Sequence, residues 1–323
     1  MKPPFTLTAQ ILNLVSEISR LLGRYEGLHL PIPQPMLRRQ NQIRTIQGSL
    51  AIEGNTLDFD QVTAILENKK VLGPKKDILE VQNALSLYES LNDFKPTASK
   101  DLLKAHAILM RNLTEGAGKY RTGAVGILKG SKVSHIAPPA SRVSGQIEDL
   151  LGFLKQDKDT SPLIKAAVFH YEFEFIHPFS DGNGRMGRFW QHLILAKYHP
   201  VFEYLPFESL VKERQADYYL AFEQSDKRGE STAFIEFSLE TIKTTLREFL
   251  DQLKPAAETP VLRLSLARER FQQHEFSRKD YMQFLKTIST ATASRDLALG
   301  VSKHILRKTG TTALAKYSFI KHG

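Results

Sequence analysis

The sequence predicts an all-α fold with one short β-hairpin, followed by a small C-terminal module of the winged helix-turn-helix type. Over most of the first 253 residues, apolar side chains recur at steps of three and four, which is the period of an amphipathic helix. The strand-like stretch in that region, residues 124–136, is short and has a Lys-Gly-Ser-Lys turn near its centre. After residue 261, helical patterns, a turn and a final strand-like stretch follow one another.

The composition is that of a globular protein, with 323 residues, 41% apolar and 24% charged. That length corresponds to about two domains of roughly 100–200 residues each. Cysteine is absent, which excludes disulfides, thiol catalysis and zinc sites built on thiolates. The sequence has no apolar run of the ~18 residues that a membrane span needs and no secretory signal at its start. We therefore expect a cytoplasmic protein without membrane association.

The first 95 residues are expected to form an N-terminal helical region. Apolar positions between Ile11 and Leu22 predict its first helix, which the prolines of residues 31–35 interrupt. A second helix is predicted over about residues 36–54, because Gly54 followed by asparagine is a typical helix stop. Two more helical patterns lie at about 59–68 and 76–91.

Residues 96–253 are expected to form the central domain, and the hairpin of residues 124–136 interrupts its helices. Ser161 and Pro162 suit the start of one of these helices, since proline is favoured in a first helical turn. The predicted helices lie at about 102–113, 143–155, 162–175, 185–197, 213–224 and 233–253. Two prolines and few apolar residues predict a linker over 254–260.

The last domain, residues 261–323, holds nearly all the excess positive charge. It has 12 Lys and Arg against 4 Asp and Glu, a net +8 of the chain's +9. The rest of the chain has 44 − 12 = 32 bases and 35 − 4 = 31 acids, so it is close to neutral. This asymmetry indicates two separate tasks, although a solvated basic face has the same composition.

Within this basic domain the pattern resembles a winged helix-turn-helix. A helix is predicted at about 276–285, then a turn at 287–289, a second helix from Thr292 towards Leu306, and a strand at 313–319. In such modules the second helix enters the DNA major groove. Facing the duplex would be Ser294, Arg295 and Lys303. The alternative is a basic module that docks another protein.

The chemistry of the central domain is concentrated in one string, HPFSDGNGRMGR, which begins at His177. Its Gly-Asn-Gly tolerates positive φ just before a helix, where exposed backbone N–H groups bind phosphate. Arg185 and Arg188, three residues apart, project from one side of that helix. Asp181 offers hard oxygen ligands for Mg²⁺, and histidine, with a reference pKa of about 6.5, suits a base at neutral pH. The string is a candidate site for nucleotide transfer.

The string matches the signature H-x-F-x-[DE]-G-N-G-R-x-x-R of the Fic family at every defined position. The chain therefore resembles Fic proteins of the Fido fold, most of which transfer AMP from ATP onto hydroxyl side chains of target proteins. Gly118–Arg121 and the hairpin after it resemble the approach to the family's target-positioning flap. The resemblance covers about residues 36–245. It implies ATP as substrate, Mg²⁺ as cofactor and a target protein with a Ser, Thr or Tyr hydroxyl.

The resemblance also implies a role for each residue of the string. His177 would deprotonate the target hydroxyl, and Asp181 would hold Mg²⁺ on the α- and β-phosphates. Arg188 would take the γ-phosphate and so orient the α-phosphorus for attack. The residues expected to bind ATP and its phosphates are Gly182, Asn183, Gly184, Arg185 and Arg188. Tyr218 and Tyr219 are candidates for the adenine pocket, although tyrosines at helical spacing are as common in a core.

A second signature, Ser49 to Gly54, fits the family's inhibitory pattern [ST]-x-x-x-E-[GN]. Ser49 and Glu53 are four residues apart and therefore share one face of a helix. The resemblance implies that Glu53 keeps the enzyme in a low-activity state by occupying Arg188.

Several alternatives stay open. The same site could remove AMP from a target or transfer another nucleotidyl or phosphoryl group, and the chain could act as a DNA-binding regulator through residues 261–323. His170, Glu172, Glu174 and His177 suggest a metal hydrolase, but no HExxH string is present and His170 suits a polar core position. A homodimer is plausible from the family resemblance.

Overall fold

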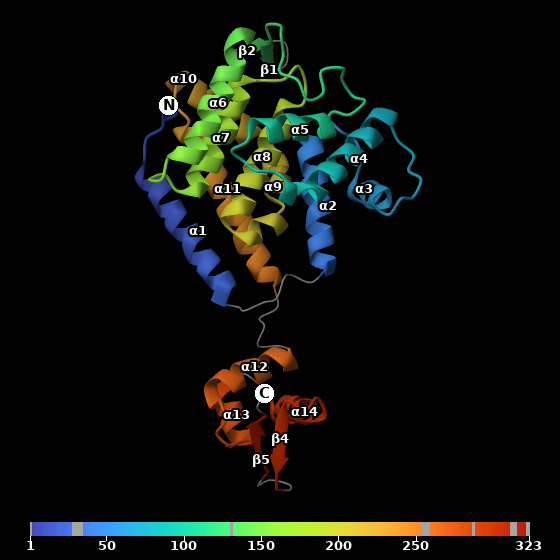
Figure 1. Cartoon of the computed structure of the whole chain (residues 1–323), viewed down its shortest axis with the longest axis vertical. Helices are drawn as coiled ribbons and strands as arrows, with labels where there is room; N and C mark the ends of the chain where they lie inside the picture. Colours follow the sequence, from blue (N-terminus) through green and yellow to red (C-terminus); the bar gives the residue numbers. More distant parts are fainter. Residues whose placement is uncertain are drawn as a thin grey trace. The chain divides into compact units, whose positions relative to one another are not determined.

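The structure is a computed structural model that describes residues 2–27, 35–129, 132–253, 259–285, 288–310 and 315–320 (Figure 1). It confirms the mainly helical fold. The chain divides into two compact units, residues 1–23 with 33–250 and residues 24–32 with 251–323, and each is described by itself. In the described part of the chain, no helix is long and apolar enough to cross a membrane.

The first unit is a bundle of helices, with short 3₁₀ turns at Leu91–Asp93 and Pro200–Tyr204. Its helices are α1 (Ala9–Gly27), α2 (Pro35–Ile52), α3 (Phe59–Leu66), α4 (Lys75–Glu89), α5 (Ser99–Leu109), α6 (Ala140–Gln156), α7 (Pro162–Ile176), α8 (Asn183–Tyr198), α9 (Phe207–Glu213), α10 (Gln215–Arg228) and α11 (Thr232–Gln252). The sequence analysis predicted each of the longer helices and missed the short α9.

Two central helices, α7 and α8, pack against each other and carry the site (Figure 1). Most side chains of α7 are buried, which matches its nearly continuous apolar sequence. In α8 the fully buried residues include Phe189 and Trp190, whose indole N–H donates to the carbonyl of Pro96 at 3.0 Å. Because both helices are packed along most of their length, the two ends of the loop between them are held in place.

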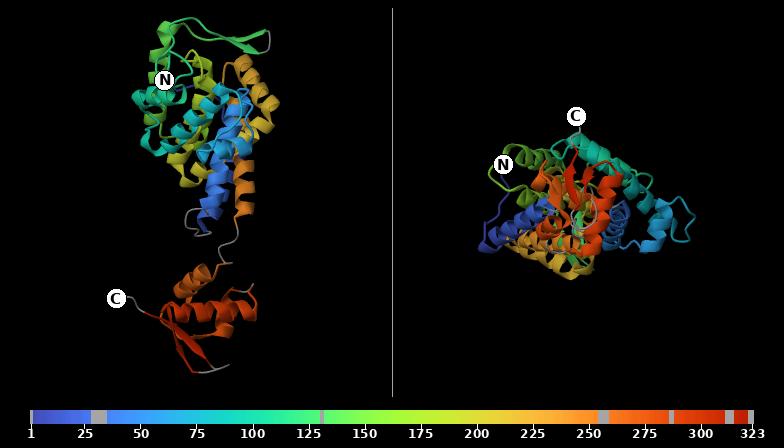
Figure 2. Two further views of the ribbon diagram at one scale, coloured as in Figure 1. Left: turned by 90° about the vertical axis from the view of Figure 1, so that its right-hand side faces the viewer. Right: turned by 90° about the horizontal axis from the view of Figure 1, so that it is seen from below.

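The predicted hairpin is present as β1 (Gly126–Lys129) and β2 (Lys132–Ile136), which pair antiparallel with an irregularity between Ile127 and Leu128. The turn residues 130 and 131 lie outside the described part of the chain. Figures 1 and 2 show the hairpin at the end of the first unit where α6 begins.

The second unit has α12 (Pro260–Phe271), β3 (Phe276–Ser277), α13 (Arg278–Leu285), α14 (Thr290–Ser302), β4 (Leu306–Thr309) and β5 (Lys316–Phe319). The three strands form an antiparallel sheet in the order β3-β5-β4. A helix-turn-helix followed by a two-stranded wing has this order of elements. The core of the unit comprises Leu264, Ala267, Phe276, Tyr281, Ala293, Leu297, Leu306 and Phe319.

The second unit differs from the prediction in three details, besides the helix α12, which the sequence analysis did not predict. Phe276 lies in β3 instead of starting a helix, because Asp280 accepts hydrogen bonds from the backbone and hydroxyl of Ser277 and so caps α13 there. The helix predicted to reach Leu306 ends at Ser302, and His304 adopts a left-handed conformation with φ +55° that turns the chain into β4. The predicted linker lies outside the described residues except for Thr259 and Pro260, which cap and begin α12.

Candidate active site

The candidate base, His177, directly follows α7 and has a left-handed backbone conformation (φ +50°, ψ +61°). Its side chain is 18% exposed, and Nδ1 lies 3.3 Å from the carbonyl oxygen of Glu174. A carbonyl oxygen can only accept a hydrogen bond, so Nδ1 carries the hydrogen and Nε2 keeps the lone pair. The imidazole is therefore held in the tautomer that can accept a proton at Nε2.

The backbone around His177 is held by a residue that the sequence analysis did not assign to the site. Arg121 donates from Nε to the carbonyl of His177 at 2.7 Å, and from its terminal nitrogens to the carbonyls of Gly123 and Pro138. Burial lowers the pKa of Arg121. One guanidinium thus ties together the end of α7, the loop before the hairpin and the loop after it. The predicted flap is anchored next to the candidate base.

Within the Gly-Asn-Gly of the motif only Gly182 has a positive φ, and Asn183 and Gly184 already belong to α8, which begins two residues earlier than predicted. Gly182 has φ +82°, and a Cβ there would collide with Met110, so glycine is required on both counts. The Asn183 side chain is 2% exposed; its oxygen accepts from the backbone N–H of Phe179 at 2.9 Å and its amide donates to the Phe179 carbonyl at 2.8 Å. The side chain therefore closes the loop, and the backbone at the start of α8 is what a phosphate would meet.

Phe179 is a packing residue. It is fully buried and stacks on His106, with ring centroids 3.6 Å apart. His106 in turn lies 3.0 Å from the Asp181 carbonyl oxygen through Nε2 and accepts from the Gly118 N–H at 2.9 Å through Nδ1. Burial lowers the pKa of His106 to about 4, so this imidazole is neutral and structural.

Arg185 and Asp181 form an ion pair at the start of α8. The Asp181 side chain is 52% exposed, and its Oδ1 accepts from Gly182 N at 2.6 Å and from Arg185 at 3.0 Å. The second terminal nitrogen of Arg185 donates to Glu80 of α4 at 3.0 Å. The sequence analysis did not assign Glu80 to the site. Its side chain is 8% exposed.

The second motif arginine, Arg188, is occupied by the predicted inhibitory residues. Its side chain is 1% exposed and donates to the hydroxyl of Ser49 at 3.1 Å, to the Ser49 carbonyl at 3.0 Å and to the carboxylate of Glu53 at 2.7 Å. Burial opposes the charge on Arg188, but the Glu53 carboxylate outweighs it and keeps the pKa well above its usual value. The predicted pairing of Glu53 with Arg188 is therefore present.

Glu53 also lies over the start of α8. A Cβ added to Gly184 would collide with the Glu53 carboxylate and approach Arg188 to 3.1 Å. The carboxylate thus occupies the space beside the Gly184 backbone where the sequence analysis expected a phosphate. Alanine at position 184 would fit only if the Glu53 side chain moved.

His170, one of the residues that suggested a metal hydrolase, lies in the core behind the site. His170 is 2% exposed, with Nδ1 2.6 Å from Gln191 and Nε2 3.1 Å from the hydroxyl of Tyr218. Burial lowers the pKa of His170 to about 3. Both of its nitrogens are engaged inside the core, as expected of a polar core residue.

The two candidate adenine-pocket residues lie in different surroundings. Tyr218 is 3% exposed and belongs to a buried cluster with Tyr171 and Phe234, whereas Tyr219 is 39% exposed. The Tyr219 hydroxyl accepts from Gln215 at 3.3 Å. Of the pair, only Tyr219 presents a ring that a ligand could reach without rearrangement.

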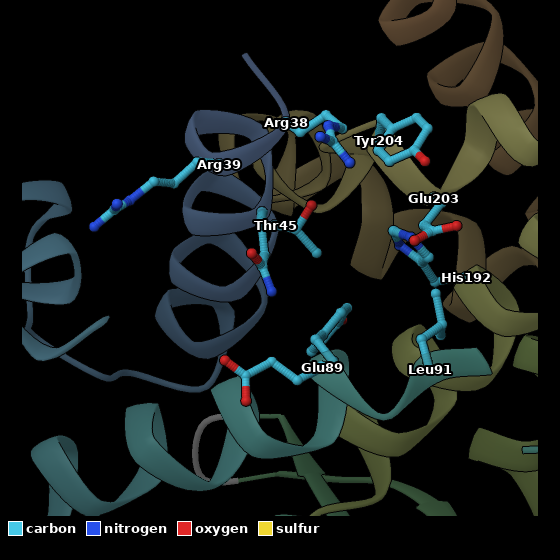
Figure 3. A pocket seen from close by; sticks show the side chains of 10 residues that line it. Arg38, Arg39, Thr45, Glu89, Leu91, His192, Glu203 and Tyr204 are labelled. Atoms are coloured by element: carbon cyan, nitrogen blue, oxygen red, sulfur yellow. The ribbon is translucent and has the colours of Figure 1, made fainter. Parts of the chain in front are cut away.

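Next to the site, a cavity of about 350 Å³ lies between α2, α4, α8 and the turn that contains Tyr204 (Figure 3). His192 and Arg38 line it, and the buried His192 Nε2 and Arg38 Nε have no hydrogen-bond partner among the described residues. His192 Nδ1 lies 3.0 Å from the buried carboxylate of Glu208. This cavity is one turn of α8 beyond Arg188.

Mg²⁺ fits the residues present. One half-exposed carboxylate combined with the phosphates of a nucleotide is a common ligand set for this ion, and Asp181 provides such a carboxylate. Among the described residues, no group of three or more His, Asp or Glu is arranged to hold a metal without such a substrate.

Comparison with known proteins gives the family. A family model described as "Fic/DOC family" matches residues 96–195. The crystal structure of a Fic family protein from Desulfovibrio desulfuricans G20 is 40% identical, with TM-score 0.75 over 100% of this chain and 99% of that one. The chain belongs to the Fic family, and its fold is the mainly helical Fido fold of that family.

More distant relatives have a named activity. "Protein adenylyltransferase fic-1" of Caenorhabditis elegans is 27% identical over 274 residues, which are 78% of this chain and 51% of that protein. "Protein adenylyltransferase Fic" of Nematostella vectensis is 28% identical over 232 residues, 68% of this chain and 51% of that protein. The chain spans about half the length of the curated relatives it matches. A solved structure of Fic-1 from C. elegans (TM-score 0.62, 22% identity, 75% of this chain and 72% of that one) shares the fold.

Proposed function

We propose that this protein transfers AMP from ATP to a hydroxyl side chain of a target protein. The observation that carries the proposal is the arrangement of Asp181, Arg185 and Arg188 around the first two turns of α8, with His177 beside Glu174, whose carboxylate lies against Gly187 of the same helix. A base, a metal ligand and two guanidinium groups beside a helix N-terminus are what nucleotidyl transfer requires. The named activity of the relatives supports the same reaction.

In the proposed reaction His177 Nε2 takes the proton of the target hydroxyl. The hydroxyl oxygen bonds to the α-phosphorus, while the bond to the leaving pyrophosphate breaks. Asp181 would hold Mg²⁺, whose charge neutralises the phosphates. The backbone N–H groups of Gly182 to Gly184 and the guanidinium of Arg185 would bind the phosphates, and Arg188 would hold the γ-phosphate so that the target oxygen attacks in line.

The proposal includes autoinhibition by Glu53. While the Glu53 carboxylate pairs with Arg188 at 2.7 Å, Arg188 cannot also receive a γ-phosphate. ATP bound in that state would have its α-phosphorus misaligned. Removal of AMP by the same site is the alternative activity: water attacks the phosphorus of AMP on a modified target, the bond to the target oxygen breaks, and the target hydroxyl and AMP are released. A target labelled beforehand with AMP distinguishes the two.

The experiment is to incubate the Glu53→Gly variant with α-labelled ATP, Mg²⁺ and a cell lysate, and to compare it with Glu53→Gly/His177→Ala. A positioned general base contributes about 10²–10⁴-fold. We expect Glu53→Gly to label proteins. In Glu53→Gly/His177→Ala the labelling rate should be lower by that factor, while ATP affinity stays unchanged. Equal labelling by both folded variants would rule out His177 as the base.

A second candidate function is DNA binding by the second unit. Arg295 and Lys303 of the second helix region are exposed, and so are Arg307 and Lys308 of β4, whereas the acidic Asp296 is buried against Arg263. The exposed face of α14 and the wing therefore has a positive charge, as DNA-binding modules of this type do.

Gel-shift assays with mixed DNA fragments at two salt concentrations test this second function. Binding that neutralises phosphates must weaken steeply as salt rises. The charge reversal Arg295→Glu is expected to weaken DNA binding at both salt concentrations without unfolding the unit. Absent binding, or binding that is insensitive to salt, would instead indicate a module that docks protein.

A further inference from the structure

Arg185 is placed between two carboxylates. One terminal nitrogen donates to Glu80 at 3.0 Å and the other donates to Asp181 at 3.0 Å. The Arg185 and Glu80 side chains are 6% and 8% exposed, whereas that of Asp181 is 52% exposed. The buried partner of Arg185 is therefore Glu80, and the accessible one is the candidate metal ligand.

This arrangement matters for metal binding because Arg185 and a cation compete for the same acceptor, Asp181 Oδ1. A guanidinium has a single positive charge, and an ion pair is stronger when it is buried away from solvent screening. As long as the Glu80 carboxylate balances most of that charge, the pair with Asp181 stays weak. Without Glu80, Arg185 would be balanced by Asp181 alone.

We propose that Glu80 is a positioning residue that shares the charge of Arg185 with Asp181 and thereby sets how readily the site takes Mg²⁺ with ATP. The inference rests on the Mg²⁺–ATP chemistry of the proposed function. Glu80 lies on α4, outside the residues 96–195 that match the family model. The exposed Lys76 lies 3.9 Å from the Glu80 carboxylate and contributes little.

The inhibitory segment reaches Glu80 as well. Asn55 donates from Nδ2 to the second oxygen of Glu80 at 2.9 Å and to the Asp77 carbonyl at 3.1 Å. Asn55 is two residues after Glu53, so one short segment is linked to both arginines of the motif. It contacts Arg188 directly through Glu53, and it is connected to Arg185 indirectly, because Asn55 binds the Glu80 carboxylate that Arg185 also binds.

The test uses the Glu53→Gly/His177→Ala chain, which is expected to bind ATP without consuming it. Calorimetric titration with ATP at a series of Mg²⁺ concentrations gives the concentration needed for half-maximal binding. With Glu80→Gln added, we expect that concentration to rise roughly threefold to tenfold, which corresponds to up to about 1.4 kcal/mol. ATP affinity at saturating Mg²⁺ should change little. A merely structural role would weaken ATP binding at every Mg²⁺ concentration alike.

Three variants serve as controls. Glu89→Gln, on the exposed side of the same helix, should leave the Mg²⁺ requirement unchanged. Glu80→Asp keeps a carboxylate and should need less Mg²⁺ than Glu80→Gln. Asn55→Ala should raise the requirement by a smaller factor, and it tests the proposal if Glu80→Gln does not fold. An unchanged or lower Mg²⁺ requirement in folded Glu80→Gln or Asn55→Ala would overturn the proposal. Because binding is measured, failure to transfer AMP would leave this result standing.

Discussion

Glu174 lies close to His177 and Arg188, two of the side chains that the proposed reaction uses. Its carboxylate is 4.0 Å from His177 Nδ1, and a Cβ on Gly187 would collide with its other oxygen, which has no hydrogen-bond partner among the described residues. Burial raises the pKa of Glu174 to about 8; Arg188 opposes this rise and Glu53 adds to it. Glu174 is therefore mostly protonated at neutral pH.

A raised pKa makes a prediction about stability. The folded protein favours protonated Glu174, so this contribution is fully present below about pH 4.5, the value of an unperturbed glutamate, and is lost as pH rises through about 8. We therefore compare the free energy of unfolding of Glu174→Gln with that of the wild type at each pH. The difference should shift in favour of the variant between pH 4.5 and pH 8.5, by on the order of 1 kcal/mol or more. Urea unfolding at the two pH values measures this, and an identical difference at both would contradict the raised pKa.

Single residues of the site were predictable where one short string contains them. His177, Asp181, Arg185 and Arg188 lie within twelve residues, and the pattern itself indicates their chemistry. Ser49 and Glu53, which reach the site from far upstream, were found by a second signature, but residues without a signature of their own could not be identified in this way. Glu80 and Arg121 contact the motif across 105 and 56 positions of sequence, and no local pattern marks a charged residue that a distant helix will bury.

At the scale of elements, hydrophobic periodicity predicted the helices that bury a face. The short helix α9 was missed, since seven residues give too few turns for the period to be recognised. The helix α12 was missed because Arg263, which is buried and paired with Asp296, looks polar in the sequence. The strand β4 was assigned to a helix end, because the left-handed conformation of His304 depends on tertiary packing.

At the scale of the whole molecule, the charge asymmetry of the sequence corresponds to two structural units. The acidic and basic residues of the first unit nearly balance, and two buried arginines of its candidate site are paired with carboxylates, Arg188 with Glu53 and Arg185 with Glu80. The second unit holds the excess positive charge. A homodimer and a cytoplasmic location stay predictions from the sequence.

The central claim is that Glu53 keeps the protein inactive by holding Arg188. Hydrogen bonds between charged groups are worth about 1.5–3 kcal/mol each, so a lost phosphate contact reduces productive ATP binding roughly tenfold to 150-fold. The variants that isolate this contact are Glu53→Gly, Arg188→Ala and the combination of the two. Arg188→Ala should be inactive with or without Glu53, because the γ-phosphate then has no partner in either case.

The most direct measurement is the rate at which purified wild type and Glu53→Gly label themselves and lysate proteins with α-labelled ATP and Mg²⁺. We expect the rate to rise by at least about tenfold in Glu53→Gly and to be lost again in Glu53→Gly/Arg188→Ala. If a folded, ATP-binding Glu53→Gly labels no faster than the wild type, the ion pair between Glu53 and Arg188 is a structural contact and the account of inhibition is wrong.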